Sequence, residues 1–100
     1  MPTLTLEREP RAARVETDET NLIVHLVDGR TVAVPLEWFP RLLHGTPLER
    51  ANLIIAGQGY GIHWPDLDED IHVEGLLAGR RSGESEKSFQ RWLDGREKPE

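Results

Sequence analysis

The fold is decided by a stretch of alternating residues around one turn, LIVHLVDGRTVAV (residues 22–34). Apolar and polar residues alternate on both sides of Asp28-Gly29, which is typical of half-buried β-strands. Asp-Gly between two β-branched runs is a strong hairpin signal, and it favours a type I′ turn with positive φ at both central residues. We therefore predict antiparallel strands over residues 22–27 and 30–34, ended by Pro35, which cannot donate a ladder hydrogen bond.

Another strand precedes this pair. Residues 13–16 have strand character, and a polar turn over residues 17–21 separates them from the next strand. Residues 13–36 are therefore predicted to form a three-stranded antiparallel meander. A further hairpin is expected near residues 53–64, where LIIA and IHW flank a glycine-rich turn.

Short helices are expected to cover the meander. Residues 37–44 fit a short helix, provided that Pro40 lies in its first turn. The sequence TPLE (residues 46–49) is a helix start, with Thr46 as N-cap and Glu49 placed to return a hydrogen bond to the cap. Two short helices are thus predicted directly after the meander.

A further short helix is predicted over residues 73–78, with Asp70 as its cap and Gly79 as its stop. Trp38 and Trp64 stand among aliphatic residues and are expected to anchor the core. The predicted fold class is α+β, an antiparallel β-meander with short covering helices and a C-terminal amphipathic helix.

The C-terminal part of the chain forms a separate segment in the sequence. After a Gly/Ser-containing linker, Phe89, Trp92 and Leu93 fall at i, i+3 and i+4 on a predicted helix over residues 85–93, which Gly95 is expected to end. We divide the chain into a flexible N-terminal arm (1–12), a compact α+β domain (13–79), and a linker with a C-terminal helix (80–100).

Composition excludes several classes of protein. The chain has 100 residues, 12 Lys and Arg against 18 Asp and Glu, a formal net charge of -6 and no cysteine. The length suits one small domain, and the lack of cysteine excludes disulfides, thiolate zinc sites and cysteine nucleophiles. No apolar run approaches the roughly 18 residues that span a bilayer, and the first residues do not read as a signal peptide. We expect a cytoplasmic protein with no membrane partner.

Two motifs resemble a known family. VPLEWFPRL (residues 34–42) and GIHWPDLDEDI (residues 61–71), followed by EGLL (residues 74–77), are similar to a widespread bacterial family of domains of unknown function. The resemblance covers residues 13–79. It implies a small α+β domain without established enzymatic activity, catalytic residues or cofactors. Stand-alone family members often lie beside the gene of a small toxin-like protein, which implies an antitoxin-like role with that protein as partner.

The segment from His63 to His72 is richest in ionisable side chains. Besides the two histidines it contains the acidic residues Asp66, Asp68, Glu69 and Asp70. The alternate aspartates resemble a calcium loop, but Ile71 and Leu77 occupy the positions where such a loop requires glycine and a bidentate glutamate. Hydrogen-bonded caps or a solvated rim explain the segment more simply, so we expect no metal ion and no cofactor.

Three functions remain open from the sequence. The first is a non-enzymatic, antitoxin-like module that binds a partner protein or a second copy of itself through Phe89, Trp92 and Leu93. Docking of this short helix on its own domain is the structural alternative. The second is a component of a DNA-binding regulator, although acidic neighbours nearly cancel the charge of its basic tail. The third is a metal-dependent hydrolase using His63 and His72, for which the sequence gives no supporting geometry.

Overall fold

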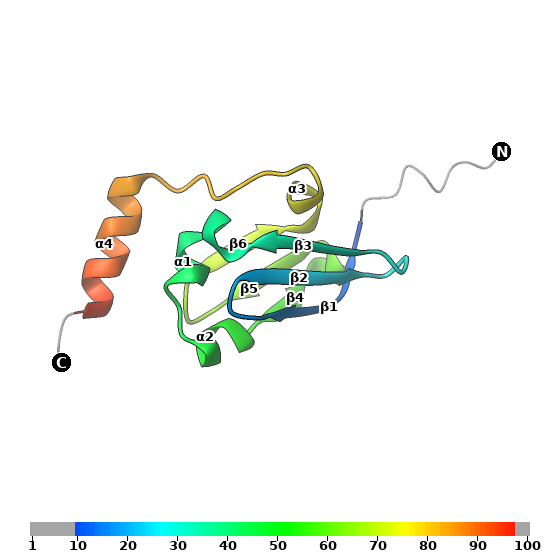
Figure 1. Cartoon of the computed structure of the whole chain (residues 1–100), viewed down its shortest axis with the longest axis horizontal. Coiled ribbons are helices and arrows are strands. Elements are labelled where there is room, and N and C mark those ends of the chain that lie inside the picture. The colour runs from blue at the N-terminus through cyan, green and yellow to red at the C-terminus, as the bar shows by residue number, and fades with distance from the viewer. Residues whose placement is uncertain (1–9, 98–100) are drawn as a thin grey trace.

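Two three-stranded antiparallel sheets face each other across the core (Figure 1). The computed structural model of the chain describes residues 10–97, so residues 1–9 of the predicted arm lie outside the described part. The first sheet has the order β1 (Ala12–Thr17), β2 (Asn21–Leu26), β3 (Thr31–Pro35). The second has the order β4 (Ile54–Ala56), β5 (Gly61–Trp64), β6 (Glu69–His72). Short helices complete the architecture, which confirms the predicted α+β class and meander.

The hairpin at Asp28-Gly29 forms as predicted, but its turn is of another type. The Gly29 N–H donates to the Leu26 carbonyl at 3.0 Å, and the Leu26 N–H donates to the Arg30 carbonyl at 2.7 Å. Only Gly29 has a positive φ, of +98°, whereas a type I′ turn requires one at Asp28 as well. The connection is therefore a three-residue loop with a glycine bulge, which leaves Val27 and Asp28 with ordinary negative φ.

Strand β6 is the element that the sequence prediction misses. Residues 66–70 suggest a loop and a helix cap, yet Glu69 pairs with Trp64 and Ile71 pairs with Ile62 along β5. Asp70 is a strand residue, and His72 occupies the N-cap of α3 (Val73–Leu77), so the predicted cap is wrong. Ile71 is the only apolar residue in this strand, and one apolar residue is too few for a recognisable period of two.

The helix predicted over residues 37–44 is two short helices, η2 (Leu36–Trp38) and α1 (Pro40–Leu43). The break is at Phe39, with φ -130° and ψ 88°, because a proline ring disfavours the helical conformation of the residue before it. The next helix, α2 (Pro47–Ala51), begins as predicted. The Glu49 N–H donates to Thr46 Oγ at 3.1 Å, and the Thr46 N–H donates to the Glu49 carboxylate at 2.9 Å.

The C-terminal helix α4 (Glu86–Glu97) is longer than predicted. It begins after Ser85, whose Oγ accepts a hydrogen bond from the Ser88 N–H at 3.1 Å. It continues through Gly95, so the predicted stop is wrong: a glycine inside a helix costs only about 1 kcal/mol, and Arg96 beyond it is held by an ion pair. Residues 80–85, without helix or strand, join α4 to the rest of the fold.

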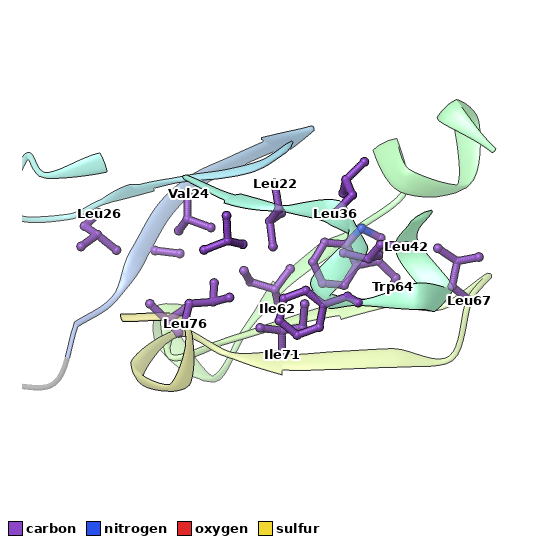
Figure 2. Packing of buried hydrophobic residues seen from close by; sticks show 14 residues of the cluster. Leu22, Val24, Leu26, Leu36, Leu42, Ile62, Trp64, Leu67, Ile71 and Leu76 are labelled. Atoms are coloured by element: carbon purple, nitrogen blue, oxygen red, sulfur yellow. The ribbon is translucent and has the colours of Figure 1, made fainter. Parts of the chain in front are cut away.

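The core lies between the two sheets. In Figure 2, Leu22 and Val24 of β2 point toward Ile62 and Trp64 of β5 in the other sheet. A turn of 3₁₀-helix, η3 (Gly57–Gly59), joins β4 to β5. The buried apolar residues come from both sheets and from η2, α1 and α3: Ala12, Leu22, Val24, Leu26, Val34, Leu36, Phe39, Leu42, Ile62, Trp64, Leu67, Ile71, Val73 and Leu76.

The two tryptophans expected in the core differ in burial. Trp64 is 0% exposed, and its Nε1 donates to the Arg50 carbonyl at 3.0 Å. Trp38 is only half-buried and lies under the Arg81 guanidinium, 4.8 Å from Cζ to the ring centroid. Trp64 is therefore a core residue as predicted, whereas Trp38 packs against the edge of the core, since the neighbouring Phe39 takes the buried position. Across residues 10–97, no helix has the length and apolar character to cross a membrane.

Candidate functional site

Helix α4, which carries the predicted partner-binding side chains, lies at one end of the molecule and contacts α2 and the end of α1 (Figure 1). Two guanidinium groups lie over the Trp92 ring, with Cζ of Arg41 5.0 Å and Cζ of Arg96 4.7 Å from its centroid. The Phe89 ring contacts Trp92 at 5.7 Å and His44 at 5.3 Å between centroids. These residues and two carboxylates make up what we call the α4 anchor: Arg41, His44, Glu49, Glu84, Phe89, Trp92 and Arg96.

Arg41 connects three segments of the chain. Its Nε and Nη2 donate to the two carboxylate oxygens of Glu84, at 2.9 and 2.6 Å, and its Nη1 donates to the carbonyls of Leu67 and Asp68, at 3.1 and 3.3 Å. Both charged side chains are largely buried, 13% and 14% exposed. Their mutual hydrogen bonds raise the pKa of Arg41 and lower that of Glu84, which also accepts a bond from Ser88 Oγ at 2.7 Å. Arg41 thus fixes the start of α4 to the β5–β6 turn.

A second ion pair, between Arg96 and Glu49, also lies beside Trp92. The Arg96 guanidinium donates to both oxygens of Glu49, at 2.8 and 3.1 Å, and this contact lowers the pKa of the carboxyl group. Glu49 also caps α2, so one carboxylate orders the start of α2 and holds the end of α4. Because each guanidinium is neutralised by its own carboxylate, both can lie against the same indole ring without leaving an unpaired charge.

Docking does not complete the burial of the α4 stripe. Phe89, Trp92 and Leu93 all stay intermediate in exposure. Two leucines that are adjacent in sequence to the anchor residues His44 and Glu49 are also exposed, Leu43 at 44% and Leu48 at 83%. Of the two arrangements considered from the sequence, the helix adopts docking on its own domain, and part of its apolar stripe remains accessible.

His63 lies opposite Asp70 in the register of β5 and β6, and its Nδ1 is 2.7 Å from the Asp70 carboxylate. Asp66 accepts a hydrogen bond from the Asn52 amide at 2.9 Å. These contacts agree with a hydrogen-bonded, solvated rim. In the part of the chain that the structure describes, no three His, Asp or Glu side chains are grouped to hold a metal ion.

Glu69 is the acidic residue that burial affects most. It is on the face of β6 opposite to His63 and Asp70, because neighbouring strand residues point to opposite faces of the sheet. With Arg41 and Glu84 it lines a cleft of about 390 Å³. Burial raises its pKa to about 7, with the nearby Arg41 charge opposing and the Glu84 charge adding to the effect. The sheet therefore separates Glu69 from His63, and the carboxylate that pairs with His63 is that of Asp70.

The basic tail residues serve partly as packing groups. Arg81 covers Trp38, and Arg96 is paired with Glu49 beside Trp92. Arg81 and Arg96 are thus engaged within the protein, although a DNA-binding protein would use such cations to contact phosphate groups.

Sequence reasoning misses the polar half of the anchor. Arg41 and Glu84 are 43 positions apart, and no local pattern relates them. Glu49 is recognised only as a cap, although Arg96 also binds it. The usable signal is indirect: an arginine directly after Pro40, among buried apolar residues, requires a carboxylate partner from elsewhere in the chain.

Comparison with known proteins identifies the domain but no activity. Residues 12–82 match the DUF2442 family, described as a protein of unknown function. No curated protein matches the chain. A crystal structure of a protein of unknown function from Rhodospirillum rubrum is 37% identical, with a TM-score of 0.69, and covers 77% of this chain and 95% of that chain.

A solution NMR structure of an uncharacterized protein from Chromobacterium violaceum shares the fold. It is 24% identical, with a TM-score of 0.62, and covers 87% of this chain and 76% of that chain. The family match includes both sheets and ends at residue 82, before α4 begins at Glu86. From this match over most of its length, we conclude that the chain belongs to the DUF2442 family.

Proposed function

We propose that the chain is a non-enzymatic protein-interaction module, and that it binds a partner protein where α4 meets α1 and α2. The observation that carries the proposal is the incomplete burial of the α4 stripe. Phe89, Trp92 and Leu93 stay partly exposed, and Leu48, next in the sequence to the anchor residue Glu49, is 83% exposed. A partner that covers these groups gains roughly 25 cal/mol for each Å² of apolar surface removed from water.

The α4 anchor supports a binding role because it orders the ring before a partner arrives. Arg41 and Arg96 both contact the Trp92 ring, so little further side-chain entropy is lost on binding. Tryptophan and arginine are also the residues that most often dominate the energy of protein interfaces.

The partner class follows from the family resemblance. An antitoxin-like role predicts a small toxin-like protein encoded beside the gene, bound by the folded module in the cytoplasm. Self-association through the same surface is the other outcome that the test must separate.

The test starts from the tagged full-length chain in its own host, with mass spectrometry of the captured proteins. The captured protein is then purified and titrated against wild type, Leu48→Asp and a matched control, Leu77→Asp, which changes an exposed leucine on α3. We expect Leu48→Asp to weaken binding about tenfold or more and the control to bind as wild type. Equal binding by both variants, or no partner together with a strictly monomeric chain in sedimentation, would overturn the proposal.

A further inference from the structure

A groove of about 800 Å³ runs along β1, and its lining residues are far in the sequence from helix α4. Val15 and Leu53 form its apolar floor, and both pack against the core from the groove side. Pro47 and Ala51 of α2 line one end. The groove is therefore an apolar opening between the first sheet and the segment that leads into β4.

The strand that borders this groove is at the edge of its sheet. Among residues 10–97, β1 pairs only with β2. The hydrogen bond from the Asp18 N–H to the Asn21 carbonyl, at 3.0 Å, sets the phase of the ladder, so Glu16 bonds inward to Ile23. Alternate residues of an antiparallel strand bond to opposite sides, so Val15 and Thr17 direct their backbone N–H and C=O groups to the edge away from β2.

The rim of the groove carries more negative than positive charge. Glu16, Asp18 and Glu19 line it, with Arg50 as the opposing cation. The contact with His25 lowers the pKa of Glu16, and backbone N–H groups led by that of Thr20 lower the pKa of Asp18. These carboxylates are thus ionised throughout the physiological range. The Arg50 guanidinium is already engaged, with Nη1 donating to the carbonyls of Leu42 and Gly45 at 3.1 and 2.5 Å.

We propose that this groove binds an extended segment of a partner protein, with alternating basic and apolar residues, which adds to β1 as a further strand of the sheet. Its apolar side chains would cover Val15 and Leu53, and its basic side chains would face Glu16 and Glu19, because strand residues alternate between the two faces. The inference goes beyond the proposed function by naming a second surface and the chemistry that it recognises.

Charge favours a foreign segment over a second copy of this chain. The net charge of -6 makes two copies of this chain repel each other. A cationic partner segment is attracted to the acidic rim instead.

The experiment uses the full chain and a synthetic peptide of alternating lysine and valine. Binding is followed by fluorescence anisotropy and by amide chemical shifts. We expect shifts concentrated at residues 15–19 and 51–53, affinity that falls with added salt, and no binding of a glutamate–valine peptide of equal length. Equal binding of the acidic peptide, or shifts confined to other elements, would overturn the proposal.

Backbone pairing is tested with two further peptides, N-methylated at either the odd or the even residues. One set faces β1 and the other faces solvent, so one peptide should lose binding about tenfold or more while the other retains it. If both methylated peptides bind, no strand is added to β1 and the inference fails. If neither binds, the two peptides do not differ as strand pairing requires, and the inference fails as well.

Variants of the protein test whether the peptide binds in this groove. Glu19→Lys should weaken the basic peptide about tenfold, and Ala51→Trp, at an exposed position, should block the groove. Glu37→Lys, an exposed charge reversal on η2, is the matched control. If the partner captured through α4 binds these groove variants normally and the peptide does not bind, the groove inference fails while the proposed function stands. If the peptide binds but Leu48→Asp has no effect on any partner, the proposed function fails and the groove remains.

Discussion

Trp64 and Trp92 hold two parts of this molecule together in opposite ways. Trp64 is fully buried between the sheets, and one hydrogen bond satisfies its indole N–H. Trp92 is partly exposed at the end of the molecule, where two guanidinium groups that carboxylates neutralise lie over its ring. The core depends on apolar burial, which salt weakens little, whereas the α4 attachment adds ion pairs, which salt screens, to the packing of Trp92 against the core. The comparison leads us to expect that α4 can be released without unfolding the domain that carries it.

The largest expected effect is a loss of stability when the tryptophan of the core is removed. Trp64→Ala removes a fully buried ring and should lower the free energy of unfolding by about 3–5 kcal/mol, which approaches the whole stability of a small domain. Urea denaturation followed by circular dichroism measures it. Trp64→Phe is the control, because it keeps a ring in the cavity and should retain a cooperative transition at lower midpoint. An unchanged midpoint in Trp64→Ala would contradict the assigned burial.

The next effect separates α4 from the core. Glu84→Gln removes the charge that neutralises Arg41, and hydrogen bonds to charged groups contribute about 1.5–3 kcal/mol. We expect hydrogen exchange in residues 86–97 to accelerate while the sheet amides keep their protection. Glu86→Gln, an exposed residue of the same helix, is the control. Equal acceleration in β2 and β5 would show that α4 and the core unfold as one unit.

A pH titration tests the boundary between the two regions, where Glu69 lies in the cleft beside Arg41 and Glu84. Its pKa is raised from 4.5 to about 7, chiefly by burial, so between these values the folded chain holds a proton that the unfolded chain has lost. The stability that protonated Glu69 contributes is full below about 4.5 and is lost as the pH rises toward 7. On the order of 1–2 kcal/mol is expected after solvent screening, and Glu69→Gln should remove this slope.

The smallest effect concerns the exposed surface beside the anchor. Leu48→Asp should change the free energy of unfolding by no more than about 0.5 kcal/mol, because a side chain that is 83% exposed has little packing to lose. Thermal unfolding measures the change, and Leu77→Asp is the comparison on α3. A loss of several degrees would place Leu48 in the folded structure's packing and would remove it from the partner surface.

The sequence predicts those elements whose signals are local. Alternation on both sides of Gly29 predicts the β2–β3 hairpin, and the spacing of Thr46 and Glu49 predicts the start of α2. Strand β6 escapes prediction because Asp70 and His72 point outward and the inward face combines the apolar Ile71 with the acidic Glu69. Its formation depends on pairing with β5, which is a tertiary effect.

The candidate site likewise contains residues that can be predicted from local sequence and contacts that cannot. Phe89, Trp92 and Leu93 can be found from their helical spacing, because amphipathicity is a property of neighbouring residues. Their docking surface cannot, since Arg41 meets Glu84 only after the intervening domain has folded. Gly95 shows the reverse error, where a local stop signal is overridden by the Arg96–Glu49 pair beyond it.

The segment over residues 80–85 makes the docking of α4 an intramolecular reaction. Six residues span at most about 20 Å, and a short tether of this kind gives an effective concentration in the millimolar range. A free copy of α4 at micromolar concentration therefore displaces very little of the attached one. Exchange of helices between two copies requires protein concentrations near millimolar, so in dilute solution each domain keeps its own α4, and any partner meets the helix and the domain as one composite surface.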